Sequence, residues 1–200
     1  HKFNMEVGDG DRKQLMSGTI DRVDICENDT DVYVRIIDYK TGKKDFNIVK
    51  TYYGIDIQLM VYMEAAMKLV AKMRPGKNVI PAGVFYYNIS DPIVSATTES
   101  AEEIEDKIKG ELRLKGMVNS DKDIAEKMDN TEGTSLNIPV SRKADGGFDS
   151  RRSKVMNTEQ FNMLGRFVDV RAVDTADRIA GGDIRRSPYK DGQFSSCERC

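Results

Sequence analysis

The order of the predicted elements in this 200-residue sequence indicates a domain of the α/β or α+β class. Two segments rich in apolar and β-branched residues, 18–25 and 32–40, predict a pair of strands. Residues 51–73 follow with helical spacing, and residues 82–89 form a strongly apolar run of strand length. A strand–strand–helix–strand order followed by further helices is typical of a sheet covered by helices.

The first two predicted strands carry charged residues among their apolar ones. Before them, Gly8-Asp9-Gly10 gives residues 3–16 a weak hairpin signal. In the first strand, alternation places Asp21 on the same face as Val23. In the second strand one face carries Val32, Val34, Ile36, Asp38 and Lys40.

The predicted helix 51–73 has an apolar face and a polar face. Facing the sheet we expect Ile55, Leu59, Tyr62, Met63, Ala66, Met67 and Val70. Facing water or a partner we expect Asp56, Glu64, Lys68 and Lys72. Pro75-Gly76 ends this helix. The strand 82–89 is apolar throughout, which predicts a central position in the sheet, and Asp91-Pro92 ends it.

Capping signals predict two longer helices in the second half of the chain. A capping box at residues 100–103 opens a charged helix that extends to about residue 115. A second cap at residues 157–160 opens a last helix, which Gly181-Gly182 ends. Between them a short helix is predicted around residues 121–128.

The chain is predicted to form one domain over residues 1–200, because no repeat or long linker divides it. We expect its core at about 13–115, and a C-terminal helical part and cysteine tail at about 116–200. The hydrophobic content of 39% and charged content of 32% fit a soluble globular protein. No apolar run approaches the roughly 20 residues that span a bilayer. No signal peptide is visible, so we expect a cytoplasmic protein without membrane contact.

The net charge of −2 means that any surface for nucleic acid must be local. Of the three cysteines, Cys26 lies in the first predicted strand and is expected to pack as a small apolar residue. Cys197 and Cys200 form a terminal C-x-x-C, which alone is a weak zinc or redox signal. The single histidine, His1, is assigned no role.

Five side chains on three neighbouring predicted elements suggest a metal-dependent phosphodiesterase site. Asp38 and Lys40 share a face at a strand end, so a carboxylate that can hold a divalent cation lies beside an ammonium that can meet a phosphate. Asp21 lies on the preceding strand, which a hairpin brings close. Gln58 and Tyr62 lie one turn apart on one helical face. An isolated Asp-x-Lys is more often a solvated strand end, and Tyr62 has a packing alternative. An unpaired acid that ends an apolar strand is costly, which favours the functional interpretation.

These segments resemble a known family. The run GTIDRVD, VRIIDYKTGKK and YYGIDIQLMVY is similar to the PD-(D/E)xK nuclease superfamily, and in particular to RecB-type exonuclease domains with a Q-x-x-x-Y motif. Further segments resemble the C-terminal nuclease domain of the B subunit of AddAB/RexAB-type helicase–nucleases. These segments are IPAGVFYYNISDPIV, LKGMVNSD, and GDIRRSPYK with CERC. The resemblance implies an α/β fold with a restriction-endonuclease-like core, a central mixed sheet flanked by helices.

The resemblance also implies a metal centre. Asp21, Asp38 and the main-chain carbonyl of Tyr39 would hold Mg²⁺ or Mn²⁺ through hard oxygen ligands. The metal would polarise the scissile phosphate and lower the pKa of the attacking water. Lys40 would stabilise the developing charge or orient that water.

DNA contacts are implied for four side chains around this centre. Gln58 and Tyr62 would position the strand, and Lys43 and Lys44 are candidates for contacts with its phosphate backbone. The sequence has no G-x-x-x-x-G-K-[ST], so no ATP hydrolysis at such a site is expected.

In that family four cysteines hold an iron–sulfur cluster, and Cys197 with Cys200 matches one pair of them. The other two are missing here, so the cluster is expected in the full-length protein and not in this fragment. Related nucleases also use an upstream His or Glu near the metal, for which this sequence offers no assigned residue.

The function expected from these features is that of a metal-dependent DNA exonuclease domain. Its context would be a bacterial helicase–nuclease complex for double-strand-break processing and recombinational repair. The partners would be the A subunit and a single DNA strand from an unwound duplex end. The alternatives are a stand-alone RecB-like or Cas4-like nuclease, or a nuclease-inactive domain that guides DNA.

Overall fold

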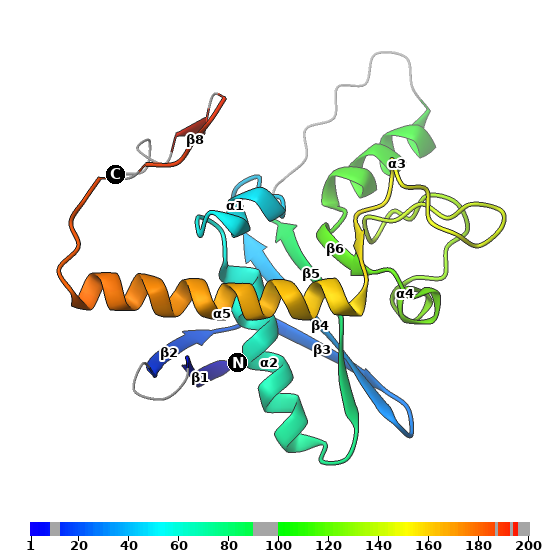
Figure 1. Ribbon diagram of the computed structural model, residues 1–200. Coiled ribbons are helices and arrows are strands. Elements are labelled where there is room, and N and C mark those ends of the chain that lie inside the picture. The colour runs from blue at the N-terminus through cyan, green and yellow to red at the C-terminus, as the bar shows by residue number, and fades with distance from the viewer. Residues whose placement is uncertain (9–12, 90–99, 187, 193, 196–200) are drawn as a thin grey trace.

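The computed structural model describes residues 1–8, 13–89, 100–186, 188–192 and 194–195, and its centre is one mixed sheet of five strands. The strands are β3 (Arg22–Glu27), β4 (Asp31–Lys40), β5 (Asn78–Asn88), β6 (Lys115–Asn119) and β7 (Val155–Met156), in this spatial order. Pairing alternates from antiparallel β3–β4 to parallel β4–β5, antiparallel β5–β6 and parallel β6–β7. The apolar β5 is therefore central, as predicted, and the expected mixed sheet flanked by helices is confirmed (Figure 1).

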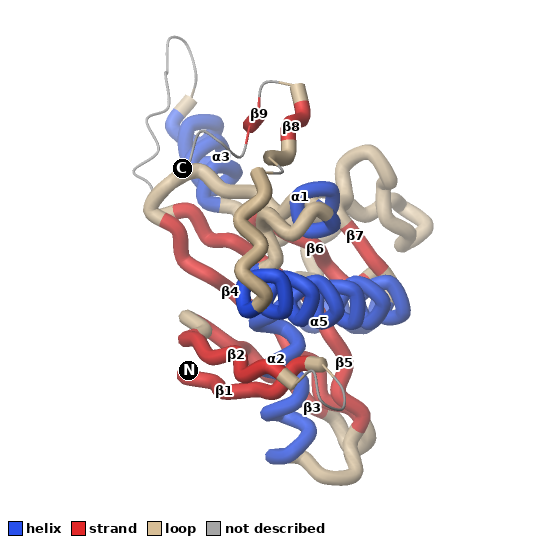
Figure 2. The backbone as a smooth tube through the Cα atoms, turned by 60° about the vertical axis from the view of Figure 1, so that its left-hand side comes forward, coloured by secondary structure: helices blue, strands red, loops and turns tan. Residues whose placement is uncertain are grey.

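Helices cover one face of the sheet in two layers. On this face α2 (Gln58–Met73) contacts β4 and β5, and α5 (Thr158–Ala180) lies across α2 (Figures 1 and 2). The buried cluster between these layers includes Val34, Ile36 and Val84 of the sheet. The opposite face carries a smaller cluster, to which α4 (Lys122–Met128) contributes. The two clusters follow from the alternation of side chains along β4 and β5.

A separate hairpin precedes the main sheet. Strand β1 (Lys2–Val7) pairs antiparallel with β2 (Gln14–Thr19), as the hairpin signal predicted. Of the predicted turn, Asp9 and Gly10 lie outside the described residues. The predicted strand 18–25 is divided, because the chain changes sheets within it. Ile20 exchanges backbone hydrogen bonds with His1 at 2.8 and 2.6 Å, on the hairpin side, before β3 joins β4.

The predicted helix 51–73 is also divided. Helix α1 (Ile48–Tyr52) is capped by Asn47, and Gly54 then adopts a left-handed conformation with φ of +75°. The N–H groups of Gly54 and Ile55 close the helix end on carbonyls one turn earlier, and α2 begins only at Gln58. Helical spacing continues across this break, which explains why the pattern predicted one helix.

Burial differs from the prediction at three residues. Asp56 was expected to face water but is only 7% exposed. Glu64 lies half-buried against Gly165 of α5, and burial raises the pKa of its carboxyl. Cys26 was expected to be packed, but it is exposed because β3 is an edge strand with little covering its end.

The capped helices form as predicted. The capping box at residues 100–103 opens α3 (Ala101–Leu112), and the cap at residues 157–160 opens α5, which ends at Gly181. Strand β6, the short β7, and the pair β8 (Lys190–Asp191) and β9 (Phe194–Ser195) were not predicted. The predicted break at Asp91-Pro92 lies outside the described residues. In the described part of the chain, no helix is long and apolar enough to cross a membrane.

Candidate active site

The site begins with an acid and a lysine at the end of β4. Asp38 follows buried Val34 and Ile36 on the face beneath α2 and is itself only 2% exposed. Lys40 lies two residues on, and its Nζ is 2.5 Å from Asp38 Oδ2. Strand alternation therefore places both groups on one face, as predicted.

Asp21 approaches the same strand end from its neighbour. It lies in the bend before β3 and not within a strand, since β3 begins at Arg22. Its carboxylate Oδ2 accepts a hydrogen bond of 2.9 Å from the backbone N–H of Tyr39. The negative charge of Asp21 also helps to raise the pKa of Asp38. Asp21 thus lies at the same strand end as Asp38, although it belongs to a bend and not to the predicted strand.

Gln58 and Tyr62 extend the group onto α2. Lys40 Nζ donates to Gln58 Oε1 at 2.9 Å, and Gln58 Nε2 donates to the Tyr62 hydroxyl at 2.8 Å. Because α2 begins at Gln58, both side chains project from its first turns. Asp38, Lys40, Gln58 and Tyr62 are therefore one continuous chain of polar contacts.

A second lysine, Lys44, is linked to this group through Asp56 and Tyr86, neither of which was predicted as a site residue. The hydroxyl of Tyr86, on β5 beside Asp38, donates to Asp56 Oδ1 at 2.7 Å. Lys44 Nζ lies 3.1 Å from the same oxygen and 4.9 Å from the centre of the Tyr86 ring. Lys40 Nζ lies 5.6 Å from that ring. The buried ring of Tyr86 is therefore shared by the two ammonium groups.

Asn88 fixes the backbone of Lys44. The N–H of Lys44 donates to Asn88 Oδ1 and the Asn88 amide donates to the Lys44 carbonyl, both at 3.0 Å. The sequence signal for Asn88 and Tyr86 was their alternation on β5. No comparable signal existed for Asp56, because it lies in the break between α1 and α2.

The ionisation of Asp38 is set by opposing influences. Burial raises its pKa most strongly, and Lys40 acts in the opposite direction. Its contact with Lys40 is an ion pair to Oδ2. This oxygen is buried, and each carboxylate oxygen has two lone pairs, so Oδ2 can accept a further ligand beside the ammonium.

The donor set around that oxygen is hard. The carbonyl of Lys40 accepts a hydrogen bond from the Ile89 N–H on the β5 side of the strand. The N–H and carbonyl of the preceding residue, Tyr39, therefore face the other side, toward Asp21. The carboxylates of Asp21 and Asp38 and the Tyr39 carbonyl are oxygen ligands of the kind that Mg²⁺ prefers. Within the described residues, no group of three or more His, Cys, Asp or Glu side chains forms a metal-binding cluster.

The comparison with protein families agrees with this geometry. The family model described as "PD-(D/E)XK nuclease superfamily" matches residues 2–200. The chain belongs to the PD-(D/E)XK nuclease superfamily. The expected restriction-endonuclease-like α/β fold is thereby confirmed.

Three curated relatives carry the same name, which describes the B subunit of an ATP-dependent helicase/deoxyribonuclease. The protein of Clostridium botulinum (strain Hall) is 38% identical over 198 residues, which is 98% of this chain. That of Caldanaerobacter subterraneus subsp. tengcongensis is 39% identical over 97% of the chain, and that of Thermoanaerobacter sp. (strain X514) is 37% identical over 92%. The chain spans 16–17% of the length of these relatives.

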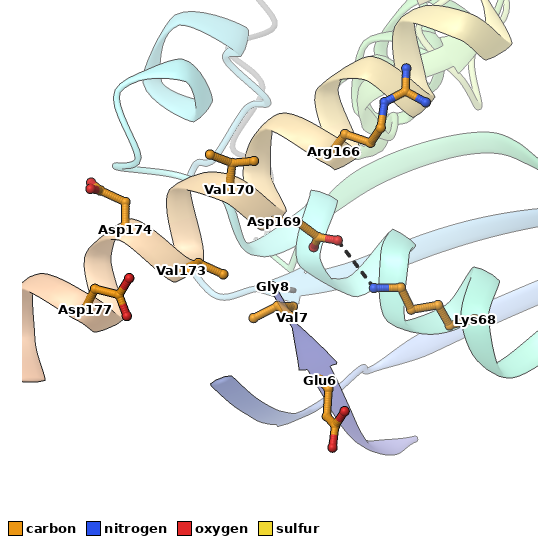
Figure 3. A pocket seen from close by; sticks show the side chains of 10 residues that line it. All are labelled: Glu6, Val7, Gly8, Lys68, Arg166, Asp169, Val170, Val173, Asp174 and Asp177. Carbon is orange, nitrogen blue, oxygen red and sulfur yellow. Dashed lines mark hydrogen bonds and ion pairs between the residues drawn. The ribbon is translucent and has the colours of Figure 1, made fainter. Parts of the chain in front are cut away.

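Other features of the chain lie apart from this site. Cys197 and Cys200 fall outside the described residues. A cavity of about 660 Å³ between β1, α2 and α5 contains none of the candidate residues (Figure 3). Its wall includes an ion pair of 3.3 Å between Lys68 and Asp169, which joins the two helices.

Proposed function

We propose that this chain is the metal-dependent DNA exonuclease domain of a bacterial helicase–nuclease. The observation that carries the proposal is the continuous polar group at the end of β4, where Asp38 and Lys40 meet Gln58 and Tyr62 of α2 beside Asp21. Superfamily membership supplies the reaction class, which is hydrolysis of a phosphodiester.

Asp21, Asp38 and the carbonyl of Tyr39 would hold Mg²⁺ or Mn²⁺. The burial of the Asp38 carboxylate at the strand end supports this assignment, as does the all-oxygen donor set. A bound divalent ion supplies Lewis-acid polarisation of the phosphodiester and a nucleophilic water at neutral pH.

The remaining side chains bind and orient the substrate. Lys40 donates to the phosphate oxygens on which negative charge develops, and Gln58 holds its ammonium in place. Gln58 and Tyr62 position the scissile strand. Lys44, held by Asp56, and the exposed Lys43 contact the flanking phosphate backbone.

The context follows from the name that the relatives share. We propose that the intact protein works with a helicase–nuclease A subunit and degrades a single strand from an unwound duplex end. Its role would be double-strand-break processing and recombinational repair in the cytoplasm, with residues 1–200 as one nuclease domain. The chain has three cysteines, fewer than the four of an iron–sulfur cluster, so we propose no cluster for this chain alone. In the full-length protein Cys197 and Cys200 would supply two of those ligands.

The test is cleavage of end-labelled single-stranded DNA by the intact protein at saturating Mg²⁺, with DNA binding measured in parallel. Asp38→Ala is expected to abolish cleavage and leave binding largely unchanged, because Asp38 holds the metal. Lys40→Ala is expected to reduce the rate by about 10²–10³-fold.

The matched control is Asp29→Ala, which removes an exposed acid from the turn at the far end of the same hairpin. It should cleave at the parental rate. Parental cleavage by Asp38→Ala would refute the assignment.

A further inference from the structure

A basic groove of about 400 Å³ opens beside the candidate site. Six cationic side chains line it, and these are Lys43, Lys44, Arg113, Lys115, Arg152 and Lys154. Among the described residues, the carboxylates that line it with them are those of Asp45 and Glu111. The groove thus holds an excess of four positive charges on a chain whose net charge is −2. This is the local basic surface that a nucleic-acid-binding protein of such overall charge requires.

The groove is continuous with the site through Lys44 and Asn88, which both line it. The backbone of Lys44 is fixed by Asn88, and its side chain turns inward to Asp56 beside the Tyr86 ring. Lys43 is the preceding residue and is exposed. A phosphate chain that occupies the groove therefore meets Lys44 at the boundary of the site.

The opposite wall comes from a segment far away in sequence, residues 129–154. An ion pair between Lys154 Nζ and Asp45 Oδ2 joins this segment to the loop after β4. The pair is about half exposed on both sides, so solvent and competing anions can reach it. Arg152 projects from the same segment and is exposed.

This segment is ordered by its own polar contacts, although it contains almost no regular structure. The carboxylate of Asp129 accepts from the Thr131 N–H and the Ser135 hydroxyl at 2.7 Å, and from the Asn137 amide at 2.9 Å. Arg113 donates to the carbonyls of residues 138 and 140 at 2.7 and 3.0 Å. The cations of this wall are thus presented from a fixed backbone, which lowers the entropy that binding costs.

We propose that the basic groove binds the phosphate backbone of single-stranded DNA next to the site of cleavage, with Arg152 and Lys154 as contacts that lie outside the nuclease motifs. The inference rests on the proposed function, which supplies the substrate. Charge complementarity selects this occupant, because a run of phosphates matches a groove lined by six cationic side chains, one of which, Lys44, also belongs to the site. Arg113 contributes charge while its guanidinium holds the wall.

The experiment measures binding of a fluorescent oligothymidylate to the intact protein across a range of salt concentrations, in EDTA so that no strand is cut. Each lost phosphate contact should reduce the slope of log K against log[salt] by about 0.7. Arg152→Ala/Lys154→Ala is expected to weaken binding and flatten the slope by about 1.4. Asp45→Asn, which releases Lys154 and removes a negative charge, is expected to strengthen binding.

Two controls separate backbone recognition from general charge effects. Lys72→Ala removes an exposed lysine at the far end of α2 and should leave the slope unchanged. An oligothymidylate with uncharged methylphosphonate linkages should bind weakly and equally to the parent and the double variant.

An unchanged slope in Arg152→Ala/Lys154→Ala, or an equal loss in Lys72→Ala, would overturn the groove assignment. A parent that binds the methylphosphonate strand as tightly as the native one would overturn it too. Cleavage is assayed separately with Mg²⁺. If the parent cleaves DNA but the salt slope of Arg152→Ala/Lys154→Ala is unchanged, the groove assignment alone is refuted. If the salt slope changes but no protein cleaves DNA, the proposed hydrolysis alone is refuted.

Discussion

Asp56 is buried, contrary to expectation, and this burial adds Tyr86 and Lys44 to the site. Its carboxylate accepts from the Tyr86 hydroxyl and pairs with Lys44, while Tyr86 is fully buried. Burial, reinforced by the bond to Asp56, raises the pKa of Tyr86, so the hydroxyl stays protonated and remains a donor. Asp56 is therefore a positioning residue that keeps Lys44 beside the Tyr86 ring.

We expect Asp56→Ala to lower the free energy of unfolding by about 1–3 kcal/mol, because the buried Tyr86 hydroxyl loses its acceptor. Asp56→Asn should cost less, since its amide oxygen can still accept. Both changes release Lys44, so the KM for DNA should rise more than kcat falls. Urea denaturation and single-strand cleavage kinetics provide the two measurements.

A double variant gives the control. When Tyr86→Phe is added to Asp56→Ala, the donor disappears together with its acceptor and little further stability should be lost. Fully additive losses from the two substitutions would contradict the proposed contact.

The shared face of Asp38 and Lys40 could be predicted from the sequence because strand alternation is a strong local constraint. Gln58 and Tyr62 followed from helical spacing. Asp56 could not be found in the same way, because its environment depends on where α1 ends and on a tyrosine 30 residues away.

Two elements were predicted as continuous and are divided, each for a local reason. The strand through residues 18–25 changes its partner at Ile20, which bonds to His1, and this change places Asp21 in a bend. The helix through residues 51–73 stops at Gly54 in a left-handed conformation. Hydrophobic periodicity continues across both breaks and hides them. In the sequence, the helix break is signalled by Gly54 and by the Asn47 cap, whereas the strand break has no such signal.

One buried carboxylate, that of Asp129, contributes to the order of the segment 129–154. Burial alone would raise the pKa of Asp129, but bonds from Thr131, Ser135 and Asn137 lower it to about 2. A carboxyl whose pKa is lowered by folding stabilises the protein above its unfolded pKa, and this contribution is lost as the pH falls through the folded value.

We therefore expect Asp129→Asn to lower the free energy of unfolding by about 1–3 kcal/mol at neutral pH. The difference from the parent should be constant above pH of about 5 and shrink between pH of about 4 and 2. Chemical denaturation of both proteins across this range measures it. A difference that does not change with pH would show that the charge of Asp129 is not what stabilises the segment.

At the scale of the whole molecule, the site is an assembly of segments from much of the chain. Four segments meet at one end of the sheet, beneath α1 in Figure 1. They are the bend before β3, the ends of β4 and β5, and the start of α2. The class, the central strand and the helical cover could be predicted because they follow from hydrophobic pattern and caps. The basic groove could not, since Lys154 and Asp45 meet across 109 residues of sequence.

Metal dependence at Asp21 and Asp38 decides whether the end of β4 is a nuclease centre. The intact protein is stripped with EDTA, and cleavage of an end-labelled single strand is followed while Mg²⁺ or Mn²⁺ is added back. We expect no cleavage in EDTA and saturable recovery in the parent. We expect no recovery in Asp21→Asn or Asp38→Asn at the same metal concentrations. Cleavage that persists in EDTA, or parental recovery in either variant, would contradict this assignment.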